Sequence, residues 1–307
     1  NGIADIQNKI ISTTREADEV FSEDGLRLMR LARQAAQLGF TPDLPTLFGA
    51  KFNASLIGKI SVERIWTELM LILHADEKYR VPYAQYNGLK VLESTEVLDY
   101  ILPELYLGKG MAQRSDFHDH DVLEHSLRTV KYADARIRLA ALLHDVGKAV
   151  AMQEKDGVIH AYGHETAGVP LAEDFLRRLT GEKALCRYVL NMVELHMKPN
   201  MYAAQNSGQK AWNRLFDRSA CPEDLLLLAK ADHRGRTNAA PYAETERTIR
   251  ARLSAYEEMM ARPHITGADL LARGIQPGEE MGRLLEEAHR LRLAGVKKED
   301  ALRQMRL

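Results

Sequence analysis

Apolar positions along the chain recur mostly with the spacing of amphipathic helices, and alternation typical of strands is scarce. The segment Asp24–Leu38 places its leucines and alanines on one helical face and arginines on the others, and Gly39 follows as a stop signal. The same spacing predicts helices over Ser61–Leu73, Tyr83–Leu92, Thr95–Ile101, Ala243–Met260, Glu279 to about Ala294, and a short stretch after Lys297. A helical block is expected from Val122 to about Asp232, so the pattern predicts an all-α protein.

Breaks in this pattern divide the chain into three parts. Glu104–Asp121 is a polar connection with two glycines, and Pro263 and Gly267 interrupt the helical pattern near the C-terminus. We therefore predict a helical neck and body over residues 1–104, a central domain over 105–240 and a helical tail over 241–307.

Composition narrows the class of protein. The chain has 307 residues, of which 45% are hydrophobic and 28% charged, as in ordinary soluble domains. A net charge of −1 argues against a uniformly basic nucleic-acid binder but permits local basic faces. Two cysteines exclude a disulfide framework and favour the cytoplasm. No apolar run approaches the ~20 residues of a membrane helix, so no membrane partner is expected.

The clearest chemistry belongs to histidines and aspartates of the central domain. These residues are His125, His144, Asp145, His164, His196 and Asp232. Imidazole suits divalent transition metals, and a carboxylate can bridge a pair of ions. A site with one or two such ions makes hydroxide near neutral pH and clamps phosphate, as phosphoester hydrolysis requires.

Basic residues near this set favour phosphate as the ligand. Lys148 is expected one turn after His144 on the same helix, and we predict catalytic roles for Asp145 and Lys148. Arg234 and Arg236 follow the last aspartate closely and are predicted to bind phosphate oxygens. A lone histidine is more often an ordinary surface or core residue, which is the interpretation for His74, His118, His120, His160, His233, His264 and His289.

The central stretches Leu143–Lys148, Glu124–Ser126, Gly163–Glu165 and Ala231-Asp232 resemble the HD-domain phosphohydrolase superfamily. The resemblance implies two ion sites that share Asp145. A first metal would be held by His125, His144, Asp145 and Asp232. His164 and His196 would hold a second one, with Asp145 as the bridge.

A candidate nucleotide site lies near the N-terminus. Asp24 and Arg27 are three residues apart, so a carboxylate acceptor and a guanidinium donor would be neighbours on one helix face. Together they can match the pairing edge of cytosine or adenine, whereas guanine and uracil offer the opposite pattern. The competing interpretation is an ordinary amphipathic helix in which Glu23 and Arg27 form an i,i+4 ion pair. From these residues alone, the second interpretation is favoured.

A wider resemblance reverses that preference. The chain is similar to bacterial CCA-adding enzymes and the related poly(A) polymerases, the class II tRNA nucleotidyltransferase family. The stretches that carry it are Asp5–Ile11, Glu23–Arg33 with Ala35–Phe40, Ile60–Ile65 with Glu68-Leu69, Leu102–Leu105, Ile265–Leu270, and Gly274–Gly278 with Met281-Gly282. One departure is Ser12, which stands where the family usually has an arginine.

This resemblance implies tRNA, CTP and ATP as partners. Asp24 and Arg27 would select the nucleotide, and Arg30 and Arg33 would support the triphosphate or the RNA end. The basic residues of the tail would anchor tRNA through its phosphates. A homo-oligomer is left open.

The family's catalytic head, which uses Mg²⁺, has no counterpart among the motifs of this chain, because no Gly-Ser or Gly-Gly turn precedes a strand with two aspartates. The chain also begins at Asn1 inside a structured-looking segment, so we expect a fragment. Two alternatives stay open. One is a stand-alone HD phosphohydrolase acting on 2′,3′-cyclic or terminal phosphates, and the other is a non-catalytic RNA-binding module.

Overall fold

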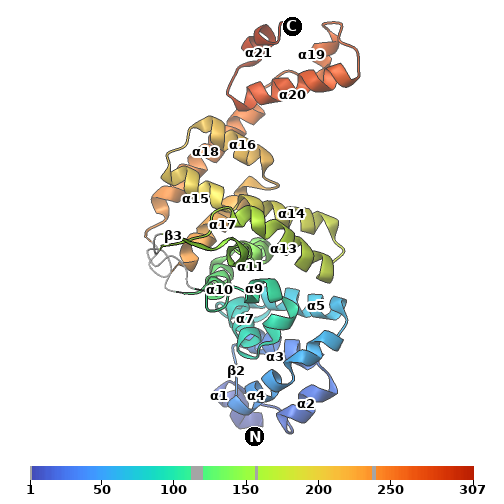
Figure 1. Ribbon diagram of the computed structural model, residues 1–307, viewed down its shortest axis with the longest axis vertical. Coiled ribbons are helices and arrows are strands. Elements are labelled where there is room, and N and C mark those ends of the chain that lie inside the picture. The colour runs from blue at the N-terminus through green and yellow to red at the C-terminus, as the bar shows by residue number, and fades with distance from the viewer. Residues whose placement is uncertain (1, 112–119, 156–157, 237–239) are drawn as a thin grey trace. The chain divides into compact units, whose positions relative to one another are not determined.

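In a computed structural model, helices make up nearly all of the regular structure (Figure 1), which confirms the prediction of an all-α protein. The structure describes residues 2–111, 120–155, 158–236 and 240–307. The chain forms two compact units, one of Asn1–His196 with Leu227–Ala240 and one of Met197–Leu226 with Pro241–Leu307. The division at residues 104 and 240 stays a prediction.

The first half of the first unit is a helical body. Its elements are α1 (Gly2–Asn8), β1 (Ile10–Ile11), α2 (Ala17–Glu23), α3 (Leu26–Leu38), β2 (Thr41–Pro42), α4 (Leu44–Phe52), η1 (Ala54–Lys59), α5 (Val62–Leu73), α6 (Asp76–Tyr79), α7 (Ala84–Ser94), α8 (Val97–Ile101) and α9 (Pro103–Tyr106). The strands β1 and β2 pair in parallel, with Ile10 opposite Thr41. Helix α3 packs against α5 and α7, so the apolar face predicted for Asp24–Leu38 lies in the core.

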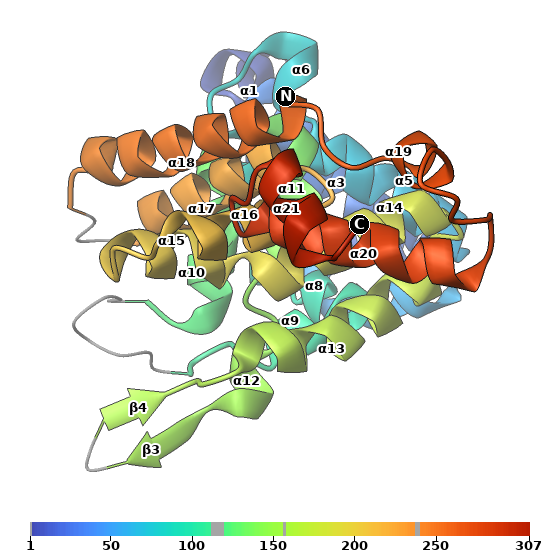
Figure 2. The same ribbon diagram turned by 90° about the horizontal axis from the view of Figure 1, so that it is seen from above.

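The second half of the first unit surrounds the candidate metal residues. It contains α10 (Val122–Tyr132), η2 (Ala135–Ile137), α11 (Arg138–Leu143), α12 (Lys148–Ala151), β3 (Gln153–Lys155), β4 (Val158–His160), α13 (His164–Leu179), α14 (Lys183–Leu195) and the later part of α17 (Pro222–Gly235). The strands β3 and β4 form an antiparallel hairpin in which Gln153 lies opposite His160. The hairpin follows α12 and precedes α13 in the chain, and Figure 2 shows it extending outward from the end of α12. The hairpin corrects the prediction of a purely helical block.

The second unit holds the tail. Its helices are α15 (Met197–Ala204), α16 (Gln209–Arg218), the first part of α17, α18 (Ala243–Ala261), α19 (Gly267–Leu271), α20 (Glu279–Leu293) and α21 (Lys298–Gln304). The side chains of Thr266 and Asp269 cap α19, and Lys298 Nζ lies 2.7 Å from the same aspartate. These contacts close a small apolar core around Leu270. In the described part of the chain, no helix combines the length and apolar character needed to cross a membrane.

Two element boundaries differ from the sequence prediction. The helix predicted from Asp24 begins at Leu26, and Asp24 instead ends α2 with an extended backbone. Its side chain accepts a hydrogen bond from the backbone N–H of Leu26, which satisfies one of the free donors at the start of α3. The predicted polar connection begins with the helix α9 and includes residues 112–119, which lie outside the described part.

An ion pair between a buried arginine and a partly exposed aspartate joins the body to the central domain. Arg138, at the start of α11, is 5% exposed and donates from both terminal nitrogens to the Asp76 carboxylate, at 2.6 Å each. The same guanidinium donates to the carbonyl oxygens of Leu73 and Ala133. The hydrogen bonds from Arg138 hold the pKa of Asp76 below its ordinary value. Their contribution to stability is therefore present above the ordinary carboxyl pKa and lost as the pH falls towards the lowered one.

Replacing this arginine should destabilise the first unit. The substitution Arg138→Ala leaves the Asp76 carboxylate and two carbonyl oxygens without their donor, so we expect a loss of about 2–3 kcal/mol in the free energy of unfolding. Chemical denaturation followed by circular dichroism measures this loss.

The matched control is Arg136→Ala. Arg136 lies two residues earlier and forms an ion pair with Asp134 in which both side chains are more than half exposed. Exposed pairs contribute little, so this variant should unfold within about 0.5 kcal/mol of the wild type. Equal losses for the two variants would contradict the importance of the Arg138–Asp76 pair.

Candidate metal centre

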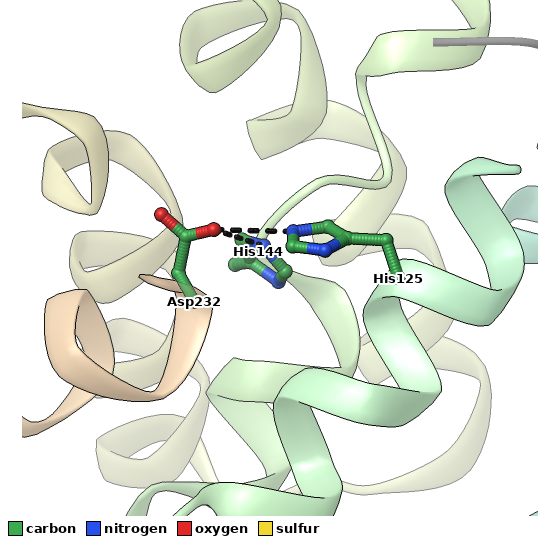
Figure 3. Close-up of side chains that lie close together, drawn as sticks. All are labelled: His125, His144 and Asp232. Atoms are coloured by element: carbon green, nitrogen blue, oxygen red, sulfur yellow. Dashed lines mark hydrogen bonds and ion pairs between the residues drawn. The ribbon is translucent and has the colours of Figure 1, made fainter. Parts of the chain in front are cut away.

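The structure brings the six candidate metal ligands together in the first unit, and all six are buried. They come from five places in the fold: His125 on α10, His144 and Asp145 in the turn after α11, His164 at the start of α13, His196 directly after α14, and Asp232 on α17. Figure 3 shows the side chains of His125, His144 and Asp232 pointing toward one another. Residues up to 107 positions apart in the sequence therefore share one site.

Three of the imidazoles are oriented in the same way. In each, Nδ1 lies close to the backbone carbonyl oxygen three residues earlier, at 2.8 Å for His144 and 2.7 Å for His164 and His196. A carbonyl oxygen only accepts, so Nδ1 carries the proton and donates it. In the neutral ring this leaves a lone pair on Nε2, which is the arrangement that metal-binding histidines use.

These lone pairs meet beside one oxygen of Asp145. The Nε2 atoms of His164 and His196 are 3.3 Å apart, and they lie 3.1 and 3.5 Å from Asp145 Oδ1. Two lone pairs facing each other at this distance repel, and a cation placed between them and the carboxylate removes the repulsion. The donor set therefore fits a metal ion.

The other oxygen of Asp145 faces a second group. His125 Nε2 lies 3.3 Å from Asp145 Oδ2 and 3.1 Å from Asp232 Oδ1. His144 Nε2 lies 3.1 Å from Asp145 Oδ2, yet among the described residues this buried nitrogen has no partner with hydrogen-bond geometry. Such a nitrogen is expensive to bury, and coordination would satisfy it. The two groups share Asp145 in the way that a bridged pair of ions requires.

Opposing effects set the charges in this site. Burial opposes the charge on His144, but the carboxylates of Asp145 and Asp232 outweigh it and raise the pKa of that imidazole. Burial likewise opposes the charge on Asp145, and the charges of His144 and Lys148 hold the pKa of that carboxyl well below its ordinary value. For His196, burial lowers the pKa and favours the neutral ring that can coordinate a metal. The site thus keeps its carboxylates ionised and at least one imidazole neutral.

Lys148 does not share a helix with His144, so that prediction was wrong. Helix α11 ends at Leu143 and Lys148 begins α12, with a turn between them. Lys148 Nζ still lies 2.6 Å from Asp145 Oδ2. The turn is tight because a β-carbon on Gly147 would lie 2.1 Å from the His164 carbonyl oxygen, so only glycine lets α13 come this close.

The two predicted phosphate-binding arginines have different surroundings. Arg236 Nη2 lies 3.3 Å from Asp232 Oδ2 and is therefore at the edge of the candidate centre. The Arg234 guanidinium lies over the Tyr132 ring, with its central carbon 4.7 Å from the ring centre. Of the histidines given ordinary roles, His120 contacts Arg128. His118 lies outside the described residues.

Comparison with known proteins identifies the family. A sequence profile described as "HD domain" matches residues 122–253, and one described as "Probable RNA and SrmB- binding site of polymerase A" matches residues 39–107. A multifunctional CCA protein of Burkholderia cenocepacia is 31% identical over 96% of this chain and 70% of its own length. Another, from Burkholderia ambifaria, is 30% identical over 97% of this chain and 70% of its own length.

This chain belongs to the multifunctional CCA protein family. Two solved structures share its fold. The Bacillus stearothermophilus CCA-adding enzyme in complex with CTP matches with a TM-score of 0.56 at 22% identity, over 96% of this chain and 63% of its own length. The Thermotoga maritima CCA-adding enzyme complexed with tRNA matches with a TM-score of 0.57 at 13% identity, over 99% of this chain and 66% of its own length. The resemblance to bacterial CCA-adding enzymes with an HD domain is confirmed.

In this member of the CCA family, the predicted nucleotide-selecting pair lies at the junction of α2 and α3. Arg27 Nη1 donates to Glu23 Oε2 and to the Val20 carbonyl oxygen, at 2.7 Å each. The ion pair of the competing interpretation is therefore present. Asp24 precedes the helix, so the expectation that it shares a helical face with Arg27 was wrong.

The two further arginines of this segment converge on one carboxylate. Glu68, on α5, is buried and lies 3.5 Å from Arg30 Nε and 2.6 Å from Arg33 Nε. This contact holds α3 against α5. Selection of nucleotides by Asp24 and Arg27, and support by Arg30 and Arg33, stay predictions.

The geometry predicts that removing a ligand from one of the two groups costs the chain one bound metal ion. If each group binds an ion, the wild-type chain should bind two Co²⁺ ions. His164→Ala should bind about one, because its group then keeps only His196 and the shared Asp145. Isothermal titration with equilibrium dialysis gives the stoichiometry.

The control is His74→Ala, which removes a more exposed imidazole that pairs with Glu77. This variant should keep the wild-type stoichiometry. The bridged arrangement fails if His164→Ala retains two tightly bound ions, or if the wild type binds none.

Proposed function

We propose that this chain acts in the maturation of tRNA 3′ ends, and that its HD centre hydrolyses phosphoesters with the help of one or two divalent transition-metal ions. The observation that carries the hydrolase proposal is the convergence of four imidazoles and the Asp232 carboxylate around Asp145. Imidazole nitrogens favour Mn²⁺, Co²⁺, Ni²⁺ or Zn²⁺ over Mg²⁺, which prefers oxygen ligands.

Different residues of the centre have different roles in this hydrolysis. The four imidazoles and Asp232 would hold the ions, and Asp145 would bridge them. When bound, such ions lower the pKa of a coordinated water and neutralise charge on a phosphate. Lys148 contacts Asp145, and Arg236 contacts Asp232. We propose that these two basic side chains bind non-bridging phosphate oxygens. In the reaction, the water oxygen bonds to phosphorus, the ester P–O bond breaks, and a proton passes to the leaving sugar oxygen.

The body and tail would serve the RNA and nucleotide side of the function. Known structures of CCA-adding enzymes hold CTP, ATP or tRNA, and a profile for an RNA-binding site matches the body. We propose that Asp24 and Arg27 select CTP and ATP, that Mg²⁺ supports the nucleotidyl transfer of the family, and that the protein works in the cytoplasm. Both contacts of Arg27 use Nη1, so Nε and Nη2 are the donors that a base edge would meet.

Removing the bridging carboxylate tests the hydrolase proposal. The substitution Asp145→Ala takes a ligand from both groups, so Co²⁺-dependent hydrolysis of a 2′,3′-cyclic nucleotide should fall by at least about 100-fold. Product release is followed by chromatography, and tRNA binding by gel shift should be unchanged.

The control for this variant is Asp174→Ala, an exposed aspartate on α13 of the same unit. It should retain wild-type hydrolysis. If Asp145→Ala still hydrolyses the cyclic nucleotide, the activity does not belong to this centre. If the wild-type chain binds tRNA but does not hydrolyse the nucleotide, only the RNA-binding role remains.

A second test distinguishes selection of the nucleotide by Arg27 from a purely structural role of its ion pair with Glu23. The substitution Arg27→Ala should abolish the preference for CTP and ATP over GTP and UTP, because the guanidinium donors are lost. Glu23→Gln removes the charge that pairs with Arg27 but keeps those donors, so this variant should keep the preference. Calorimetric titration with the four nucleotides measures it, and loss of preference in both variants would favour the structural interpretation.

A further inference from the structure

A stacked pair of aromatic rings, one half-buried and one exposed, lies at the base of the β3–β4 hairpin. The rings of His160, the last residue of β4, and Tyr162 are stacked, with centroids 4.9 Å apart and planes 12° apart. Tyr162 is 77% exposed, although most of a tyrosine ring is apolar. A stacked pair with one ring this open offers a flat surface on which a further aromatic ring can lie.

This pair is tied directly to the candidate metal centre. Tyr162 stands two residues before His164, so their Cα atoms are at most about 7.6 Å apart. The residue between the two stacked rings, Ala161, accepts the Nδ1 hydrogen bond that orients His164. The stacked pair and a metal-facing imidazole are therefore held by the same short segment.

The remaining surroundings indicate what kind of aromatic ligand this position would suit. A phosphate at the centre would meet the basic groups of Lys148 and Arg236, described above. A nucleoside phosphoester is the common ligand that joins a phosphate to a flat aromatic group over a distance of this order. Exposed aromatic side chains bind nucleobases by stacking, which every base allows because each has a π-face.

We propose that His160 and Tyr162 form a stacking platform for the nucleobase attached to the phosphate that the HD centre hydrolyses. This inference rests on the proposed hydrolase function and adds the residues that bind the base of a nucleotide or of an RNA 3′ end. The platform is base-tolerant, since stacking alone distinguishes bases only by the area of their rings. Tyr162 is a specificity-determining residue and takes no part in the bond changes.

The test compares a nucleotide with a substrate that lacks the base. In Tyr162→Ala, the KM for a 2′,3′-cyclic purine nucleotide should rise roughly tenfold while kcat stays close to wild type. Hydrolysis of glycerol 1,2-cyclic phosphate, the same five-membered ester without a base, should be unchanged. Tyr162→Phe keeps the ring and should restore the wild-type KM.

The control is Tyr100→Ala, a 52%-exposed tyrosine on α8 in the body. It should change neither substrate's KM. Equal losses on both substrates in Tyr162→Ala, or failure of Tyr162→Phe to restore binding, would overturn the platform, because either result indicates a general disturbance of the centre.

A binding measurement separates this inference from the proposed function. If the wild type hydrolyses neither substrate, the hydrolase proposal fails. Calorimetry in the presence of Co²⁺ then compares adenosine 5′-monophosphate with ribose 5-phosphate. Tighter binding of the former that disappears in Tyr162→Ala supports the platform, and equal affinities for the two ligands overturn it.

Discussion

The Asp145 carboxylate has to face two groups of imidazoles at once while it is excluded from water. A buried carboxylate is costly unless cations or hydrogen-bond donors surround it, and here its two oxygens divide four histidines and Lys148 between them. This demand explains why five separate segments of the chain meet at one point. It also explains the glycine at position 147, where any side chain would push α13 and its histidine away from the carboxylate.

The backbone takes part in this arrangement as much as the side chains do. Three of the histidines sit at or beside helix termini, where the carbonyl three residues earlier is available to accept from Nδ1. The ring orientation is therefore set by contacts within each segment of the chain. Long-range packing then only has to bring the rings together, which gives a centre with little freedom to rearrange.

Helical spacing was enough to predict the all-α class, the histidine and aspartate motifs predicted the six residues that converge, and the family was predicted from resemblance to known proteins. The hydrophobic period reports burial, and histidine and aspartate in this order have few other uses in a helical domain. Features that depend on tertiary contacts were missed. The β3–β4 hairpin is too short to give an alternation signal, and the turn at His144 interrupts a stretch whose composition reads as continuous helix. His160 looked like an ordinary histidine because its partner, Tyr162, carries no motif. Arg138 stands directly before the apolar run Leu139–Leu143, and no role was predicted for it from the sequence.

The Arg138–Asp76 pair has an evolutionary consequence. It crosses the boundary that sequence composition suggests between body and HD domain, together with the hydrogen bonds from Gln85 to the Val130 and Lys131 carbonyls and from Tyr86 to Glu124. A gene rearrangement that removed or exchanged the HD segment would leave polar groups on α5, α6 and α7 stripped of their partners. Recombination at that point is therefore penalised unless several substitutions accompany it, and the two segments are expected to be inherited as one block.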